Sequence, residues 1–436
     1  MSVDALPLVL PPGPMRRDRT LAAYDAARGR DLSRIYFWGH EAVLANRADY
    51  IHTVLVERAD DFQKPPLLAV NAKPLLGNGL LTSDNALNRR QRRLISPAFA
   101  HKRVLEYAPV MVNWAERQQA TWKDGQTLDA PDELLAITLG VMGELLLSAD
   151  LLKRARGVAG ALRVLMNFAV DQVRDPWRAA LSIPHALVSL HFLNRTVYRH
   201  IAARRDSGDP EADLLSLLLF ARDDEGNGMG EALVRDEAMT LFLAGLETVA
   251  IMLFWSVYLL ASHPEARERL EREVDGVLAG RPPTAEDLPR LPFTMQVFKE
   301  ALRLYPPAYI VARQAIRPVA LGDVTLPPGS IVHISPYLRH RDPEHFANPD
   351  VFDPDRWADP DAEKRLPRYA FLPFGGGPRV CVGGHFALLE GHLMLAALAQ
   401  RVRFEAIPGA DAFPEPLFTL RPAGKAPMRV FRRGGA

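Results

Sequence analysis

Apolar residues recur at intervals of three and four positions over much of the chain, which is the spacing of a helix with one buried face. Between residues 85 and 278 this pattern predicts mainly helical structure. Shorter runs at 34–38, 42–45, 319–326 and 331–335 have strand character, and turn residues separate them at Gly39–His40 and Pro327–Gly329. We therefore expect a mainly α protein (α+β) with small β-sheets.

The remainder of the chain fits one continuous domain. A proline-rich irregular stretch covers 342–373, a helix is predicted from Gly384 to Val402, and short strands follow near Leu417 and Met428. We find no repeat period and no Gly/Ser linker. Residues 1–436 are thus expected to form a single domain that is partly β over 1–75 and 319–335, mainly helical over 85–310, and closed by a loop and helix over 371–402.

One segment is apolar around its whole circumference. Residues 239–262 carry a single charged residue, Glu247, and are long enough to span a bilayer. The central helix of a large soluble core has the same pattern, and the polar flanks favour that interpretation and no membrane span. Gly245, Glu247 and Thr248 predict an interruption with a proton-carrying group, because a buried carboxyl is costly unless it is partnered or functional.

Composition narrows the class of protein. Lysine and arginine number 53 against 52 acidic residues, so no global basic field for nucleic acid exists, and 48% hydrophobic residues are ordinary for a soluble globular protein. A single cysteine excludes an intrachain disulfide framework. The apolar run Ala5–Leu10 is too short for a signal segment, and Pro7, Pro11, Pro12 and Pro14 break any helix there, so we expect a cytoplasmic protein.

The only cysteine lies in a glycine-rich loop, residues 371–384, with the sequence FLPFGGGPRVCVGG. Cys381 directly precedes a predicted helix, and Arg379 stands two residues earlier. The helix N-terminus, the loop N–H groups and this cation favour a thiolate, and hence a reactive or metal-bound sulfur. A small buried hydrophobe is the alternative for a lone cysteine. A phosphate-binding loop is excluded because no Gly-Lys-Ser/Thr follows.

Residues 374–383 carry the haem-binding signature F-x-x-G-x-R-x-C-x-G at every fixed position. In this the chain resembles the cytochrome P-450 monooxygenases of the soluble bacterial type. The resemblance implies the P-450 fold, a helical haem-enclosing domain with small sheets, and haem b (iron protoporphyrin IX) as cofactor. It also implies Cys381 as the iron ligand, with Phe374 and Arg379 among the haem-binding residues.

Two further segments match the same family in order along the chain. Glu300-Ala-Leu-Arg303 resembles its E-x-x-R helix motif, and a spacing of three puts both side chains on one helix face. The later segment 352–357 resembles the one that supplies a second arginine, here Arg356. The resemblance implies that Glu300, Arg303 and Arg356 form a structural trio with no catalytic role.

The segment Ala244–Thr248 is similar to the family's distal-helix motif, [AG]-G-x-[DE]-T. The resemblance implies that Ala244 lies at the haem and that the glycine-weakened turn opens a groove for dioxygen. Thr248 would donate a hydrogen bond there and Glu247 would help deliver protons, so these two are the catalytic candidates. Their presence favours a reductase-driven monooxygenase over a peroxide-dependent relative.

Residues 79–99 look like the family's haem-flanking helix, with one departure. Asn88 stands where many members carry Trp or His, and its amide can still donate to a haem propionate. Arg313, which follows the Pro306–Pro307 turn, is placed like a propionate arginine. The resemblance therefore implies that Arg92, Arg313 and Arg379, with Asn88, bind the two carboxylates of haem.

Cations also gather at residues 89–93 and 101–103. They form either a solvated helix face or, as the resemblance implies, a docking surface for an acidic electron donor. The chain is too short for a fused flavin reductase, so a ferredoxin with its reductase or a flavodoxin-type protein is the expected partner. Nucleic-acid binding is excluded because aromatic residues do not alternate with the cations.

The implied activity is that of an oxidoreductase, a hydroxylase-type monooxygenase acting on paired donors. It would insert one atom of O₂ into a hydrophobic terpenoid, carotenoid or fatty acid, because apolar residues dominate 64–80, 162–200, 308–311 and the surroundings of Phe418. Lys64 or Lys73 would hold a substrate carboxylate, or be a plain surface lysine. A haem-thiolate binding or sensing protein without turnover and a membrane protein built on 239–262 are the alternatives. We expect a monomer.

Overall fold

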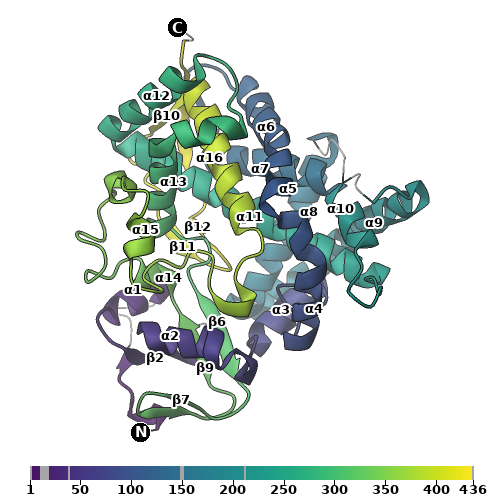
Figure 1. Ribbon diagram of the computed structural model, residues 1–436, viewed down its shortest axis with the longest axis vertical. Coiled ribbons are helices and arrows are strands. Elements are labelled where there is room, and N and C mark those ends of the chain that lie inside the picture. Colours follow the sequence, from purple (N-terminus) through teal and green to yellow (C-terminus); the bar gives the residue numbers. More distant parts are fainter. Residues whose placement is uncertain (1, 10–18, 38–39, 148–151, 211–212, 435–436) are drawn as a thin grey trace.

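The computed structural model describes residues 2–9, 19–37, 40–147, 152–210 and 213–434. Most of the molecule is helical, and the largest sheet lies near the N-terminus, at the bottom of the view in Figure 1. The predicted mainly α fold with small sheets is confirmed. Trp38, Gly39 and the N-terminal positions Leu10, Pro11, Pro12 and Pro14 lie outside the described residues.

Sixteen helices are described, and many begin at a proline in the first turn, where a missing N–H costs nothing. The predicted helical region between 85 and 310 contains most of them. Their bounds are α1 Arg19–Ala26, α2 Ala48–His52, α3 Pro66–Leu76, α4 Asn85–Ile95, α5 His101–Glu106, α6 Ala108–Ala120, α7 Ala130–Leu147, α8 Leu152–Arg174, α9 Pro176–Ser207, α10 Leu214–Phe220, α11 Glu231–Ser262, α12 Pro264–Leu278, α13 Pro292–Leu304, α14 Pro336–Arg339, α15 Ala362–Arg365 and α16 Gly384–Arg401.

The apolar segment 239–262 is the second half and centre of α11, around which α7, α10, α13 and α16 pack. By length and composition α11 could cross a bilayer, but 72% of its most apolar window is buried inside the protein, as in a core helix.

The predicted interruption of this helix is wrong as far as the backbone is concerned, because α11 is continuous. A Cβ atom on Gly245 would lie 2.5 Å from the sulfur of Met142 on α7. Gly245 therefore permits two core helices to approach closely.

The strands form one larger and three smaller sheets. In the six-stranded sheet the order is β1-β2-β3-β9-β6-β4, and β10-β13-β5 form a second sheet. The predicted strands near the N-terminus, at 319–335 and at the C-terminus are present. Their bounds are β1 Leu8–Val9, β2 Leu32–Phe37, β3 His40–Ala45, β4 Phe62–Gln63, β5 Gln126–Asp129, β6 Val311–Ala315, β7 Val319–Leu321, β8 Val324–Leu326, β9 Ile331–Ile334, β10 Val402–Ala406, β11 Pro414–Pro416, β12 Leu420–Pro422 and β13 Pro427–Arg432.

A buried ion pair joins α13 to the irregular segment that follows α14. Glu300 and Arg303 are both fully buried, and two N–H groups of Arg303 donate to the two carboxylate oxygens at 2.8 and 2.9 Å. Arg356 donates to Glu300 Oε1 at 3.2 Å, and Trp357 Nε1 donates to Oε2 at 3.0 Å. Arg303 also donates to the carbonyls of His340, Pro349 and Val351. The trio thus fastens the segment that leads into the cysteine loop.

Candidate functional site

In the middle of α11, one turn is less buried than the residues on either side of it. Leu243 and Val249 are buried, whereas Ala244 is exposed and Thr248 is half-buried. The Thr248 hydroxyl donates to the carbonyl of Ala244 at 2.6 Å, one turn earlier. This turn therefore interrupts the buried surface of α11.

Glu247 is on the same turn and is also half-buried. Burial raises the pKa of Glu247, while the Arg421 guanidinium and the Thr419 hydroxyl act in the opposite direction. Because the net pKa shift is upward, the carboxyl retains its proton to higher pH than an exposed glutamate. It is therefore suited to hold and release a proton beside the exposed turn.

The cysteine loop is a tight turn that ends at the first residue of α16. The Cys381 N–H donates to the Phe374 carbonyl at 2.9 Å and closes the loop. Gly377 has φ of +68°, and a Cβ atom there would lie 1.9 Å from the Leu55 carbonyl oxygen, so glycine is required. Phe374 packs against Gly384. The loop thereby fixes where the sulfur points.

Cys381 has accessible surface and is nonetheless surrounded by protein. Burial raises the pKa of its thiol, and the Gly383 N–H and the Arg92 guanidinium lower it. The predicted loop N–H group is present, but the cation that lowers this pKa is Arg92 in place of the predicted Arg379, and burial outweighs both groups. A bound metal cation deprotonates such a thiol outright. Arg92 itself donates to the Val380 carbonyl at 2.7 Å, within the cysteine loop.

Three cations lie together beside this loop: Lys64, Arg313 and Arg379. Burial lowers the pKa of Lys64 well below its usual range, and Arg313 and Arg379 lower it further. Burial and then Arg379 lower the pKa of Arg313 to about 10. In the described part of the chain none of the three forms an ion pair with a carboxylate. Such a cluster is costly unless an anion occupies it.

The hydrogen bonds of the cluster leave a donor for that anion. Arg379 donates to the Ser83 carbonyl at 3.0 Å and to Asn85 Oδ1 at 2.8 Å through one nitrogen. Its other terminal nitrogen is buried with no partner. Arg313 donates to the Ala312 carbonyl, on its own strand. A buried dianion such as the two propionates of haem fits these donors.

Lys64 is the member of the cluster that the sequence misplaced. We expected it to hold a substrate carboxylate or to lie at the surface, and it is instead half-buried close to Arg313 and Arg379. Its neighbours are about 250 and 315 positions away in the chain, so no local pattern marks it. Lys73, the alternative, is exposed on α3.

Asn88 does not join the cluster. Its side-chain amide donates to the Leu80 carbonyl at 2.8 Å and to Ser83 Oγ at 3.1 Å. Both N–H groups are therefore committed, and the remaining amide oxygen is an acceptor that repels a carboxylate. Contrary to the sequence-based expectation, Asn88 holds the preceding loop in place and has no donor left for a propionate.

That loop, residues 77–80, is fastened to α11. The backbone N–H of Asn78 donates to Asp236 at 2.8 Å, and that of Leu80 donates to Glu237 at 2.9 Å. A Cβ atom on Gly79 would lie 2.1 Å from Thr240 Oγ1, so the loop lies directly on the helix. Burial and the neighbouring Asp236 raise the pKa of the fully buried Glu237 to about 8, although the Leu80 N–H lowers it.

The chain matches the cytochrome P450 family over residues 26–425, most of its length. It belongs to the cytochrome P450 family. The chain is 43% identical to cyclooctatin synthase of Streptomyces melanosporofaciens over 80% of this chain and 78% of that one. It is 35% identical to pentalenene oxygenase of Streptomyces avermitilis over 96% and 94%.

The fold agrees with solved P450 structures. The crystal structure of the cytochrome P450DA heme domain superposes with a TM-score of 0.89 at 25% identity, over 99% of this chain and 98% of that chain. Haem is therefore the cofactor of this P450. The accessible Cys381 sulfur fits the iron of haem. The cluster of Lys64, Arg313 and Arg379, which has no carboxylate partner among the described residues, fits its propionates.

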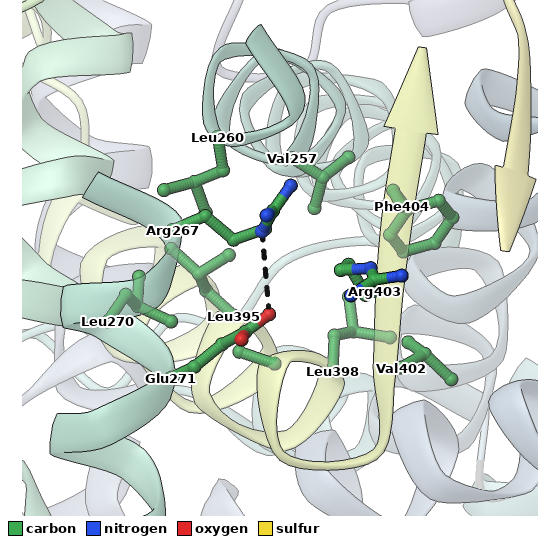
Figure 2. Close-up of a pocket in the computed structure, with 11 residues that line it drawn as sticks. Val257, Leu260, Arg267, Leu270, Glu271, Leu395, Leu398, Val402, Arg403 and Phe404 are labelled. Atoms are coloured by element: carbon green, nitrogen blue, oxygen red, sulfur yellow. Dashed lines mark ion pairs between the residues drawn. The ribbon is translucent and has the colours of Figure 1, made fainter. Parts of the chain in front are cut away.

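A small hollow lies elsewhere in the P450, near the C-terminal end of α11. Figure 2 shows it between α11, α12, α16 and β10, with Arg267 and Glu271 paired at 3.8 Å. Its volume is about 30 Å³, enough for one or two waters. None of the predicted site residues lines it, so we assign it no role.

The basic cluster of this P450 is partly neutralised. Arg89 pairs with Asp60 at 2.6 Å, and Arg90 pairs with Asp223 at 2.8 Å. Arg93 and Lys102 are exposed. The cationic surface that this cluster can offer to a partner protein is therefore smaller than the sequence implies.

Proposed function

We propose that this P450 inserts one oxygen atom of O₂ into a terpenoid, using electrons from a separate ferredoxin-type or flavodoxin-type protein in the cytoplasm. Monooxygenase activity on a hydrophobic compound follows from the family and its relatives. Pentalenene oxygenase and cyclooctat-9-en-7-ol 5-monooxygenase are named for compounds of the terpenoid class, which favours terpenoids over carotenoids and fatty acids.

The observation that carries the reaction type is the exposed turn of α11. Bound haem supplies oxygen activation at its iron, which the Cys381 thiolate would hold. The Thr248 hydroxyl donates to the Ala244 carbonyl, so its oxygen can accept a further hydrogen bond at the exposed turn. Glu247, with its pKa raised, holds a proton one residue away. A haem-binding sensor would have no need for this pair.

The residues that would hold haem divide into one that would bind the iron and a group that would bind the propionates. Cys381 would ligate the iron, and Lys64, Arg313 and Arg379 would bind the propionates. Arg92 contacts the loop that carries the ligand and moderates the thiol pKa. Phe374 and Ala244 would border the cofactor. These assignments are proposals, supported by the burial and charge described above.

Electron supply by a separate protein is proposed from the exposed cations Arg93 and Lys102 beside α4 and α5. Such a surface suits an acidic donor, and its association would weaken as ionic strength rises. We propose that the protein acts as a monomer.

The substrate class is tested by titrating the purified holoenzyme with a cyclic terpene hydrocarbon, a carotenoid and a long-chain fatty acid. A ligand that displaces water from the iron shifts the Soret band. We expect a saturable shift with the terpene alone, followed by a singly oxygenated product when electrons are supplied. A shift with only the fatty acid would contradict the terpenoid assignment.

Replacing Cys381→Ser tests the iron ligand. We expect the thiolate-type absorption of the reduced carbonyl complex to be lost, because an alcohol oxygen replaces the only sulfur at this position. An unchanged spectrum would show that the ligand is elsewhere.

Replacing Thr248→Ala tests the proposed proton delivery. We expect at least a tenfold fall in product formed per electron pair, with hydrogen peroxide released instead, because positioned proton transfer contributes roughly 10²–10⁴-fold. Both products are measured in one reaction with Thr196→Ala as control, since Thr196 makes the same bond to the carbonyl one turn earlier on α9. Equal coupling in wild type and Thr248→Ala would remove the proposed role.

A further inference from the structure

A second hollow lies in the irregular segment between α14 and the cysteine loop, on the side of the molecule that carries α15 (Figure 1). Its volume is about 170 Å³. A cavity of roughly 150 Å³ is large enough for one benzene ring, so this hollow can hold a single six-membered ring. Neither Cys381 nor Thr248 lines it, and the three cations of the proposed propionate site do not line it either. It is therefore separate from the haem site.

Two aromatic side chains line this hollow. Phe346 and Trp357 are 4% and 7% exposed, and their ring centroids lie 6.3 Å apart. The indole N–H of Trp357 already donates to Glu300, so the rest of the side chain is apolar. Aromatic rings add a favourable ring–ring interaction to the free energy of burial. The lining therefore favours a ligand that is itself aromatic.

The polar part of the lining has an excess of positive charge. Glu300 pairs with both Arg303 and Arg356, so one carboxylate faces two guanidinium groups. Arg356, which lines the hollow, pairs with no other carboxylate of the described residues. Its Nε donates to Glu300 and one terminal nitrogen donates to the Asn348 carbonyl. The second terminal nitrogen has no partner among the described residues, so Arg356 still has a charged donor available.

His345 supplies a second donor to the lining. Arg339 donates to His345 Nε2 at 2.9 Å, and because arginine has no acceptor, this ring nitrogen carries no proton. The proton of the ring is therefore on Nδ1, which has no hydrogen-bond partner in the part of the chain that the structure describes. The nearest carboxylates, those of Asp342 and Glu344, do not line the hollow, and Asp342 is paired with Arg339 at 2.9 Å.

We propose that this hollow binds an aromatic carboxylate with a single six-membered ring. The carboxylate accepts hydrogen bonds from Arg356 and His345, of which the bond from the guanidinium is charge-assisted. The ring lies against Phe346 and Trp357. The positive charge favours an anion over an amine, and the volume excludes a compound of several fused rings. The site thus goes beyond the proposed function, because its ligand is not the terpenoid.

The hollow is connected to the cysteine loop through Trp357. The ring of Trp357 packs against that of Phe371, the first residue of the loop, with the centroids 4.8 Å apart. Arg356 and Trp357 also bond to Glu300 on α13. A ligand that contacts these two side chains binds the segment in its folded arrangement and so stabilises it.

The proposal is tested by equilibrium dialysis of the purified holoenzyme against radiolabelled benzoate, with the Soret band recorded at each concentration. Benzyl alcohol and benzylammonium compete for the site as probes with the same ring and a neutral or a positive group. The variants are A347W, which fills the hollow from its exposed side, and H345F, which keeps a ring and removes the donor. A358W is the matched control, because Ala358 is an exposed alanine of the same segment that does not line the hollow. The Soret band of each variant verifies that it is folded and loaded.

We expect wild type and A358W to bind one benzoate per chain without a Soret shift. A347W and H345F should each bind benzoate at least about tenfold more weakly, and both uncharged and cationic probes should compete at least about tenfold more weakly than benzoate itself. The proposal is overturned if wild type binds no benzoate at concentrations up to about 10 mM. It is also overturned if either variant binds benzoate as tightly as wild type does, or if benzylammonium competes as well as benzoate. A Soret shift that accompanies binding would place the ligand at the iron and overturn it as well.

Discussion

At the scale of single residues, the cluster of Lys64, Arg313 and Arg379 has opposite effects before and after haem binds. Without an anion, one buried and two half-buried cations repel one another and lack part of the hydration that they would have in water. The lowered pKa values of Lys64 and Arg313 express this cost. With a dianion between them the same charges become favourable.

Replacing Lys64→Met should therefore change two properties in opposite directions. We expect the haem-free protein to become more stable by about 1–3 kcal/mol, because one buried charge is gone. We expect haem to dissociate about tenfold faster, because one charge-assisted contact is lost. Thermal unfolding of the haem-free protein and transfer of haem to an apo-globin measure the two effects.

Lys73→Met is the matched control, because this lysine is exposed nine positions further along the chain. It should change neither property. Haem dissociation from Lys64→Met at the wild-type rate would exclude Lys64 from the propionate site.

At the scale of elements, the contact between loop 77–80 and α11 depends on protonation. The pKa of Glu237 is raised to about 8, so the folded protein binds this proton more tightly than the unfolded chain does. The stability that this proton contributes is fully present below the ordinary glutamate pKa and is lost as pH rises through about 8.

We therefore expect the free energy of unfolding of wild type to fall relative to Glu237→Gln between pH 5 and pH 9, by on the order of a few kcal/mol. Denaturant titrations of both holoproteins at pH 5, 7 and 9 give the difference. Glu231→Gln, at the exposed start of the same helix, should run parallel to wild type. If Glu237→Gln also runs parallel, the carboxyl is ionised over the whole range.

Helices were the elements that the sequence predicted best, since their apolar spacing is local. Strand β5 lies inside the region expected to be mainly helical, because its pairing partner β13 follows about 300 residues later. Gly245 was interpreted as an interruption of α11, whereas the space that it leaves is filled by Met142 from another helix. Both differences come from contacts between residues far apart in the chain.

In the candidate site too, features set by local sequence were predicted and features set by contacts between distant residues were not. The cysteine loop and the Ala244–Thr248 turn are contiguous segments, and a sequence pattern identifies them. Lys64 acquires its environment only through folding, and Asn88 loses its donors to a loop whose conformation the sequence does not specify. Burial also reversed the expected direction of the Cys381 pKa shift.

At the scale of the whole molecule, the Glu300–Arg303 pair connects α13 with the long irregular segment before the cysteine loop. We expect Glu300→Gln to lower the free energy of unfolding by about 3–5 kcal/mol, because Arg303 then remains buried without its counter-charge. Urea unfolding followed at the Soret band measures the loss.

Asp361→Asn is the control for this change. Lys364 and Asp361 have the same spacing of three, but their side chains are 81% and 60% exposed. An exposed pair contributes less than about 1 kcal/mol, so this variant should unfold almost as wild type does. Equal destabilisation by the two substitutions would show that burial of the Glu300 pair does not increase its contribution to the free energy of unfolding.

The single cysteine has a practical consequence for anyone handling this protein. Because the one thiol of the chain has accessible surface and would be bonded to iron in the holoprotein, a thiol-specific reagent can modify only molecules that have no haem. The number of reactive thiols per chain then equals the haem-free fraction of a preparation. Cofactor loading can thus be counted by chemistry that is independent of colour.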